Sequence, residues 1–83
     1  MQALLYPIST EKAINMIERN NIIGYVVDMR STKADIKKEF EGIFKVKVAK
    51  VATARTMRNT KKAFITLASG YKASDIALKL KLV

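Results

Sequence analysis

The sequence predicts an α+β domain in which a mainly antiparallel sheet is layered with helices and carries an extended basic β-hairpin. Three observations lead to this prediction. The hydrophobic residues change between a period of about two and a period of about 3.6 along the chain. The predicted elements follow the order β-α-β-α-β-β-α, and two adjacent strands form one hairpin. The chain has 83 residues without a linker or a repeat, so we expect residues 1–83 to form a single domain.

The first third of the chain predicts a strand, a helix and a second strand. The short apolar run 3–6 indicates the first strand. Ser9 or Thr10 then offers a hydroxyl cap for a helix that continues to about Arg19. Residues 22–29 are rich in β-branched and aromatic side chains, which favours the second strand.

The clearest helix is expected over residues 31–44. Thr32 and Asp35 have the spacing of a capping box, and Lys37 with Glu41 has the spacing of an ordinary i,i+4 ion pair. Apolar residues recur at helical spacing along the same segment and are expected to face the core. These residues are Ile36, Phe40, Ile43 and Phe44.

The second half predicts a hairpin and a final helix. Lysines and valines alternate from Lys45 onward, but the alternation slips near Ala49. A β-bulge at that point would restore the pattern, and a strand leaving the edge of the core would explain it equally well. The partner strand, 62–67, has Ala63, Ile65 and Leu67 on one face, and residues 73–80 predict the helix.

Aromatic residues are expected in the core rather than at a binding site. Phe40, Phe44 and Phe64 occupy periodic apolar positions. An RNA-recognition-motif domain would display paired aromatic residues on its central strands within a Gly- and Phe-rich signature. The segment KKAFITL, residues 61–67, is not that signature. This absence argues against base stacking on the sheet, so a nucleic-acid partner, if the charge pattern indicates one, would be recognised through its backbone and shape.

Positive charge is concentrated in the predicted hairpin. The net charge is +9, and no acidic residue occurs between Gly42 and Ser74. A few lysines on an edge strand can prevent aggregation, but residues 45–62 hold seven cations and no acid. Such segregation favours a nucleic acid as partner. The seven cations are Lys45, Lys47, Lys50, Arg55, Arg58, Lys61 and Lys62.

The predicted hairpin tip adds donors suited to folded RNA. Arg55 and Arg58 supply forked guanidinium groups, while Asn59 and Thr60 supply an amide and a hydroxyl. The lysines of the helix over 31–44 are weaker indications, because they alternate with acids as on any solvated helix face.

Composition argues against several other functions. The chain has no cysteine and no histidine, which removes thiolate nucleophiles, the usual zinc sites and the commonest general base. We therefore expect no enzyme, cofactor or metal. An acylphosphatase-like enzyme would need a glycine-rich loop, which the three glycines do not form. A membrane-surface protein is the other alternative, but the predicted helices lack the cationic, Trp- or Phe-rich form typical of interfaces. No segment resembles a membrane span or a signal peptide, so we expect a cytoplasmic protein.

Several motifs resemble the L23 family of large-subunit ribosomal proteins. They are PISTEKA at 7–13, STKADIKKEFEGIFKVKV at 31–48, VATARTMRNTKKAFITL at 51–67 and GYKASDIALKLKLV at 70–83, the last being similar to the archaeal branch. The resemblance implies a structural constituent of the large ribosomal subunit, bound to large-subunit ribosomal RNA (rRNA) near the polypeptide exit tunnel. It also implies contact with the L29 family, docking of the signal recognition particle, chaperones or the translocon, no small-molecule substrate, and a monomer within the ribosome. A generic basic RNA-binding module outside the ribosome is the alternative.

The resemblance also assigns roles to residues. Glu11 corresponds to an acidic residue associated with factor docking in bacterial relatives. The segment TMRNT, residues 56–60, is shorter than the basic tip of bacterial members, which argues against a tunnel-lining role. Ala52 stands where family members often have asparagine. The positions implied to contact RNA are Thr10, Lys12, Lys33, Lys37, Lys45, Lys47, Arg55, Arg58, Lys61 and Lys62.

Overall fold

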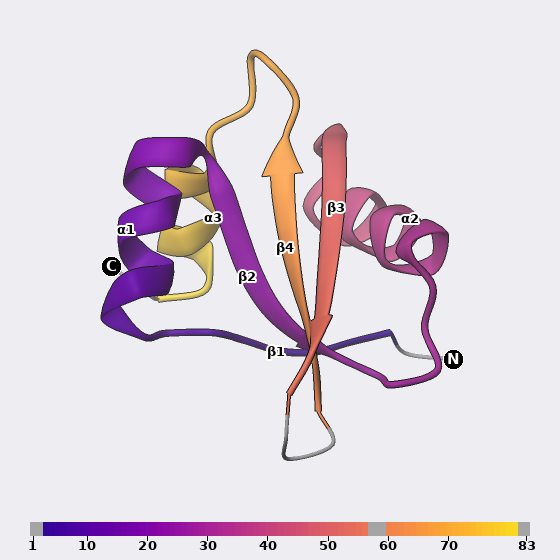
Figure 1. Ribbon diagram of the computed structural model, residues 1–83. Helices are drawn as coiled ribbons and strands as arrows, with labels where there is room; N and C mark the ends of the chain where they lie inside the picture. Colours follow the sequence, from indigo (N-terminus) through magenta and orange to yellow (C-terminus); the bar gives the residue numbers. More distant parts are fainter. Residues whose placement is uncertain (1–2, 57–59, 82–83) are drawn as a thin grey trace.

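Strands and helices follow one another in the order that the sequence predicts. The computed structural model describes residues 3–56 and 60–81. Its strands form one antiparallel sheet in the order β1-β2-β4-β3, with three helices beside it (Figure 1). The predicted α+β class is therefore confirmed. The elements are β1 (Leu4–Pro7), α1 (Glu11–Asn20), β2 (Ile22–Val27), α2 (Lys33–Phe44), β3 (Val48–Arg55), β4 (Lys61–Leu67) and α3 (Ala73–Lys79).

The described helices lie in two groups beside the sheet. Figure 1 shows α1 and α3 next to β2, and α2 next to β3. β1 pairs only with the second half of β2, from Tyr25 to Val27, so the first half of that strand is flanked by α1 instead. Helices α2 and α3 cover one face of the sheet and enclose the main core with it, and Ile17 of α1 joins this core at its edge. On the other face, which we call the open face, the described residues form one small apolar cluster, next to α1: Ile8, Ala13 and Val26.

Strand alternation decides which side chains enter the main core. Ile23 and Tyr25 of β2 face the helices together with Ile65 of β4, and each of these three is buried. Phe40 of α2 is fully buried, and its ring meets those of Tyr25 and Phe44 at centroid distances of 6.4 and 4.6 Å. These rings fill the space between α2 and the sheet, as the helical spacing of the apolar residues predicts.

Ile43 does not join this core, so its predicted core position is wrong. Its side chain is 57% exposed. It lies in the last turn of α2 beside an open hollow that also contacts Ala3, where the chain enters β1. The hollow leaves more than half of its side chain exposed, although its helical spacing matches that of Ile36.

Of the two explanations for the slip near Ala49, the structure shows the β-bulge, and the strand that carries it starts later than expected. The pairing of β3 with β4 shifts between Val48 and Lys50, which leaves Ala49 as the extra residue. Lys45 belongs to the end of α2 rather than to a strand, since it takes the left-handed conformation with φ of 57° and its N–H donates to the Glu41 carbonyl. Such a residue ends the helix and redirects the chain toward β3.

Asn21 connects the end of α1 to the start of α3, which is distant in the sequence. It closes α1 in the left-handed conformation, with φ of 59°. Its side-chain amide donates to the Tyr71 carbonyl at 2.8 Å, and its side-chain oxygen accepts from the Ala73 N–H at 2.6 Å. Lys72, at the cap position of α3, makes no capping hydrogen bond with its own side chain. Asn21 therefore supplies the cap of α3 from 52 positions away.

The predicted capping box at the start of α2 is confirmed. The Thr32 hydroxyl accepts from the Asp35 N–H at 3.1 Å, and the Asp35 carboxylate accepts from the Thr32 N–H at 3.0 Å. These reciprocal bonds satisfy two N–H groups that the helix itself leaves without acceptors.

Asp35 should therefore make stability depend on pH in the acid range. The backbone N–H of Thr32, followed by the Thr32 side chain, holds the pKa of this carboxyl below its usual value of 3.8. Because the folded-state pKa is the lower one, the stabilisation is present above 3.8 and is lost as the pH falls through the folded-state value. Asp35→Asn should lower the free energy of unfolding at neutral pH and flatten its pH dependence below 3.8, which urea denaturation would measure. A variant that keeps the wild-type slope would contradict this assignment.

Candidate nucleic-acid interface

The open face carries a hollow between α1 and β4. Its volume is about 380 Å³. Thr10 and Lys12, at the start of α1, lie on one side of it, and Lys62 and Phe64 of β4 lie on the other. Three residues that are predicted to contact RNA therefore line one hollow: Thr10 and Lys12 from the N-terminal segment, and Lys62 from the hairpin. The complete lining is Ile8, Thr10, Lys12, Ala13, Met16, Lys62 and Phe64.

Phe64 belongs to this hollow, so its predicted place in the core is wrong. Alternation along β4 directs Ala63 and Ile65 into the main core. Phe64 is therefore in phase with Lys62 and points to the open face, where it is only partly buried. The signal was present in the sequence, because the same alternation that selects Ala63 and Ile65 assigns Phe64 to the opposite face.

Gly24 of β2 forms the floor beneath Phe64. The two residues are partners in the β2–β4 register, and the Ile8 N–H donates to the Gly24 carbonyl at 3.0 Å. A Cβ atom at position 24 would lie 3.2 Å from Cδ1 of Ile8 and 3.6 Å from Cδ1 of Phe64. The missing side chain therefore allows the side chains of Ile8 and Phe64 to approach each other over the strand.

Three cations lie on the open face. Lys12 and Lys62 line the hollow, and Lys50 of β3 pairs with Thr66 on the side opposite the core. Among the residues that the structure describes, no carboxylate lines this hollow. Within the described residues the only ion pair joins Arg30 to Asp28, at 3.6 Å. The positive charges of the open face are therefore not neutralised by the described part of the protein, and they can attract an anionic partner.

The acids of α2 bind backbone groups instead of lysines. Glu39 accepts from the N–H groups of Ala3 and Leu4 at 3.0 and 2.6 Å, and Glu41 accepts from the Val48 N–H at 2.8 Å. The predicted ion pair between Lys37 and Glu41 is not formed, so that prediction is wrong. The physical reason is that charge-assisted bonds to backbone N–H groups fix the strands next to α2, whereas an exposed i,i+4 pair contributes little.

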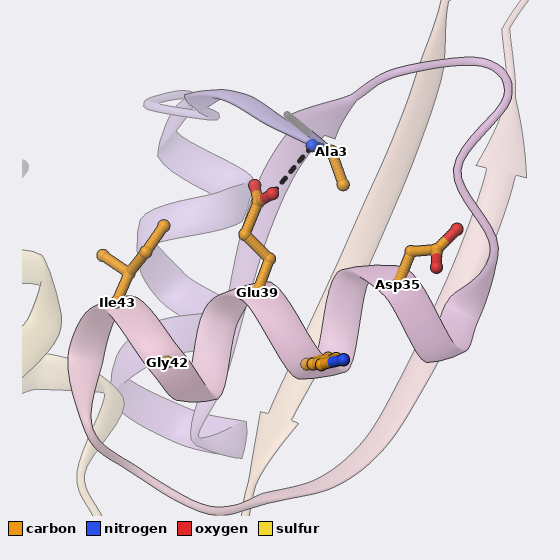
Figure 2. A pocket seen from close by; sticks show the side chains of 6 residues that line it. Ala3, Asp35, Glu39, Gly42 and Ile43 are labelled. Carbon is orange, nitrogen blue, oxygen red and sulfur yellow. Dashed lines mark hydrogen bonds between the residues drawn. The ribbon is translucent and has the colours of Figure 1, made fainter. Parts of the chain in front are cut away.

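A second hollow lies beside Glu39 and has a structural role. Figure 2 shows Glu39 directed toward Ala3, between Asp35 and Ile43 along α2. The volume of this hollow is about 470 Å³. Both carboxylate oxygens of Glu39 already accept hydrogen bonds. The carboxylate therefore anchors β1 to α2. Among the described residues, no three acidic side chains gather to hold a metal ion.

Glu39→Gln should loosen the N-terminal strand. The amide keeps one acceptor oxygen but presents an NH₂ group to the second backbone N–H, which loses its acceptor. We expect the free energy of unfolding to fall by about 1–3 kcal/mol. Amide hydrogen exchange at Leu4, together with urea denaturation, would measure the change. Glu18→Gln on the exposed face of α1 is the matched control and should have little effect; equal losses in the two variants would contradict the anchoring role.

At the described end of the hairpin, the residues that are predicted to contact RNA have different surroundings from one another. The Thr56 N–H donates to the Thr60 carbonyl at 2.9 Å, and the two hydroxyls share a hydrogen bond, so Thr60 helps to close the hairpin. Arg55 is exposed on the edge strand β3. Lys61 is partly buried and donates from Nζ to the Ser31 carbonyl at 2.6 Å, which ties β4 to the segment before α2. The predictions for Arg58 and Asn59 lie outside the described residues.

The remaining predicted cations do not join the open face. Lys33 and Lys37 are exposed on α2, which covers the opposite face of the sheet. Lys45 and Lys47 are exposed in the connection between α2 and β3, and the Lys47 carbonyl accepts from the Ala68 N–H. The cations therefore surround the domain rather than form a single patch. This distribution suits a partner that contacts more than one side of the protein.

Glu11 is the acidic residue at the edge of this interface. It is exposed in the first turn of α1, which Thr10 caps by accepting from the Ala13 N–H at 3.3 Å. Consecutive helix residues point roughly 100° apart, so Glu11 and the adjacent Lys12 project in different directions. An anionic partner at Lys12 would leave Glu11 accessible to another molecule.

The fold and the unpaired cations define a class of protein: a small basic α+β domain whose surface is suited to a polyanion. None of the helices in the described parts of the chain has the length and apolar character needed to cross a membrane. The family model of ribosomal protein L23 matches residues 2–76. The large ribosomal subunit protein uL23 of Methanothermobacter thermautotrophicus is 46% identical over 77 residues, which are 93% of this chain and 90% of that protein. The chain belongs to the ribosomal protein L23 family. The resemblance seen in the sequence motifs, including its archaeal type, is thereby confirmed.

Proposed function

We propose that this chain is a structural constituent of the large ribosomal subunit in the cytoplasm, where it acts as a single, non-enzymatic domain that binds large-subunit rRNA near the polypeptide exit tunnel. The observation that carries this proposal is the juxtaposition of Lys12 and Lys62 across one hollow that no carboxylate lines. Membership of the L23 family, and the similarity to an archaeal large-subunit protein, indicate which polyanion to expect.

The proposed mechanism is electrostatic and depends on the shape of the RNA. Lysine and arginine side chains that contact phosphates release counterions, and this release favours binding at low salt. The cations occur on the open face, on α2 and at the hairpin, so a folded RNA that encloses the domain contacts more of them than a straight helix does. The fold of the rRNA, rather than a base sequence, then determines specificity.

The proposal includes docking of other proteins on the side that the RNA leaves free. Glu11 is the residue that we assign to factor docking, because it is exposed and carries a negative charge next to a cationic surface. The expected partners are a neighbouring protein of the L29 family and the signal recognition particle, chaperones or the translocon. The protein is expected to act as a monomer within the ribosome, without a small-molecule substrate or cofactor.

A binding comparison tests the ribosomal assignment. The free protein is titrated with large-subunit rRNA and with an unrelated structured RNA of equal length, across a salt series. We expect a preference for the rRNA that persists near physiological salt, because shape-specific contacts remain when the nonspecific electrostatic attraction is screened. Equal affinities that fall together as the salt concentration rises would support the generic RNA-binding module and contradict the ribosomal role.

A further inference from the structure

We propose that the hollow between α1 and β4 holds one unpaired nucleotide of the bound RNA, with its base against Phe64 and its phosphates beside Lys12 and Lys62. This inference rests on the proposed function, because it names the part of the RNA that the open face binds. It also departs from the expectation, drawn from the sequence, that bases do not stack on this sheet.

The wall of the hollow is chemically unlike a phosphate site. Four of its seven lining residues are apolar, and Phe64 is the only aromatic residue among them. An aromatic ring offers a flat apolar surface that gains free energy by stacking on a base but cannot donate to a phosphate. Its volume of about 380 Å³ lies near the lower end of the roughly 300–1,000 Å³ range of small-ligand sites.

The polar lining residues stand at the two sides of this apolar wall. Lys12 and Thr10 come from the start of α1, and Lys62 comes two residues before Phe64 on the same strand face. A base against Phe64 would therefore have a cation on either side for the phosphates that flank it. Because no carboxylate of the described residues lines the hollow, an acidic ligand meets no repelling negative charge there.

This arrangement favours an unpaired nucleotide over a duplex. In an A-form helix the faces of the bases are covered by their neighbours, and the accessible groups are phosphates, 2′-hydroxyls and base edges. None of these covers the apolar wall formed by Ile8, Met16 and Phe64. A base from a bulge or a loop presents its face, and it can enter a recess while its neighbours remain outside.

The test uses the full chain with Phe64→Trp, which introduces the only tryptophan of the sequence. The probes are a single-stranded oligoadenylate of about eight nucleotides and a blunt RNA duplex with the same number of phosphates. Anisotropy of a label on the RNA measures binding, and tryptophan fluorescence reports stacking separately. We expect quenching at saturation with the single strand and none with the duplex. Ile43→Trp, which places a tryptophan on α2 across the sheet, is the control and should not be quenched.

Phe64→Leu provides a second measurement that keeps an apolar wall but removes the aromatic face. Single-stranded RNA should bind at least about fivefold more weakly to this variant. The salt dependence of binding should not change, because no cation is lost. Three outcomes would overturn the inference without contradicting RNA binding. They are saturable binding without quenching, equal quenching by the duplex, and an unchanged affinity of the leucine variant. An anisotropy that never rises with any RNA would contradict the proposed function itself.

Discussion

Replacing Phe40 by alanine should lower the free energy of unfolding by about 3–5 kcal/mol, the largest effect that we expect from a single substitution. Phe40 is fully buried between α2 and the sheet, and its ring contacts those of Tyr25 and Phe44. Truncation removes the buried ring and leaves a cavity that the neighbouring rings cannot fill. Since small domains are stable by only about 5–15 kcal/mol, the variant should be partly unfolded near 37 °C.

Phe64→Ala is the matched control for this prediction, because it removes the same atoms from the open face. Phe64 is partly exposed and lies outside the main core, so we expect less than half the loss of the Phe40 variant. Urea denaturation followed by circular dichroism would give both values. Similar losses at the two positions would mean that the hollow beside α1 contributes as much to stability as the main core, which contradicts the packing described above.

The second large effect concerns RNA binding. Changing Lys12, Lys50 and Lys62 together to glutamine should reduce the slope of log affinity against log salt by about 2–3 for large-subunit rRNA. Each of these side chains lies on the open face and pairs with no carboxylate of residues 3–56 or 60–81, so each can contact a phosphate. The affinity at low salt should fall as well. Filter binding or anisotropy across a salt series would measure both quantities.

A second triple variant separates local contacts from net charge. Lys38, Lys72 and Lys79 are exposed and are not predicted to contact RNA. Their replacement by glutamine removes the same three positive charges and should change the salt slope much less. If both triple variants lose equal affinity and slope, the protein attracts RNA through its net charge, and the open face has no special role.

Much of the fold follows from local patterns that tertiary contacts do not override. The Thr32–Asp35 capping box and the slip near Ala49 are both local signals, and the structure confirms each. The residues at which helices and strands begin and end were less predictable. The alternation that begins at Lys45 reads as a strand, but that residue ends α2 in the left-handed conformation. A repeating pattern of lysine and valine does not reveal where a helix stops.

Predictions about the site depended on which face each residue occupies. The sequence shows where the cations lie along the chain, but it does not show which of them are neighbours in space. Lys12 and Lys62 line the same hollow only because α1 packs beside the sheet. Ile43 shows the same limit, since its spacing indicates the core but its side of the last turn of α2 is mostly exposed, whereas the adjacent Phe44 packs against the core. The roles of Glu39 and Asn21 were also hidden, because their partners are backbone groups at least 35 positions away.

The strand order β1-β2-β4-β3 has a consequence for folding during synthesis. The second strand has only the short β1 as a neighbour until residues 61–67 have left the ribosome, because β4 separates it from β3. The start of α3 in turn depends on Asn21, a residue made 52 positions earlier. Contacts of such high sequence separation form late. The N-terminal half therefore cannot complete its sheet on its own, and the domain closes only when nearly the whole chain has been made.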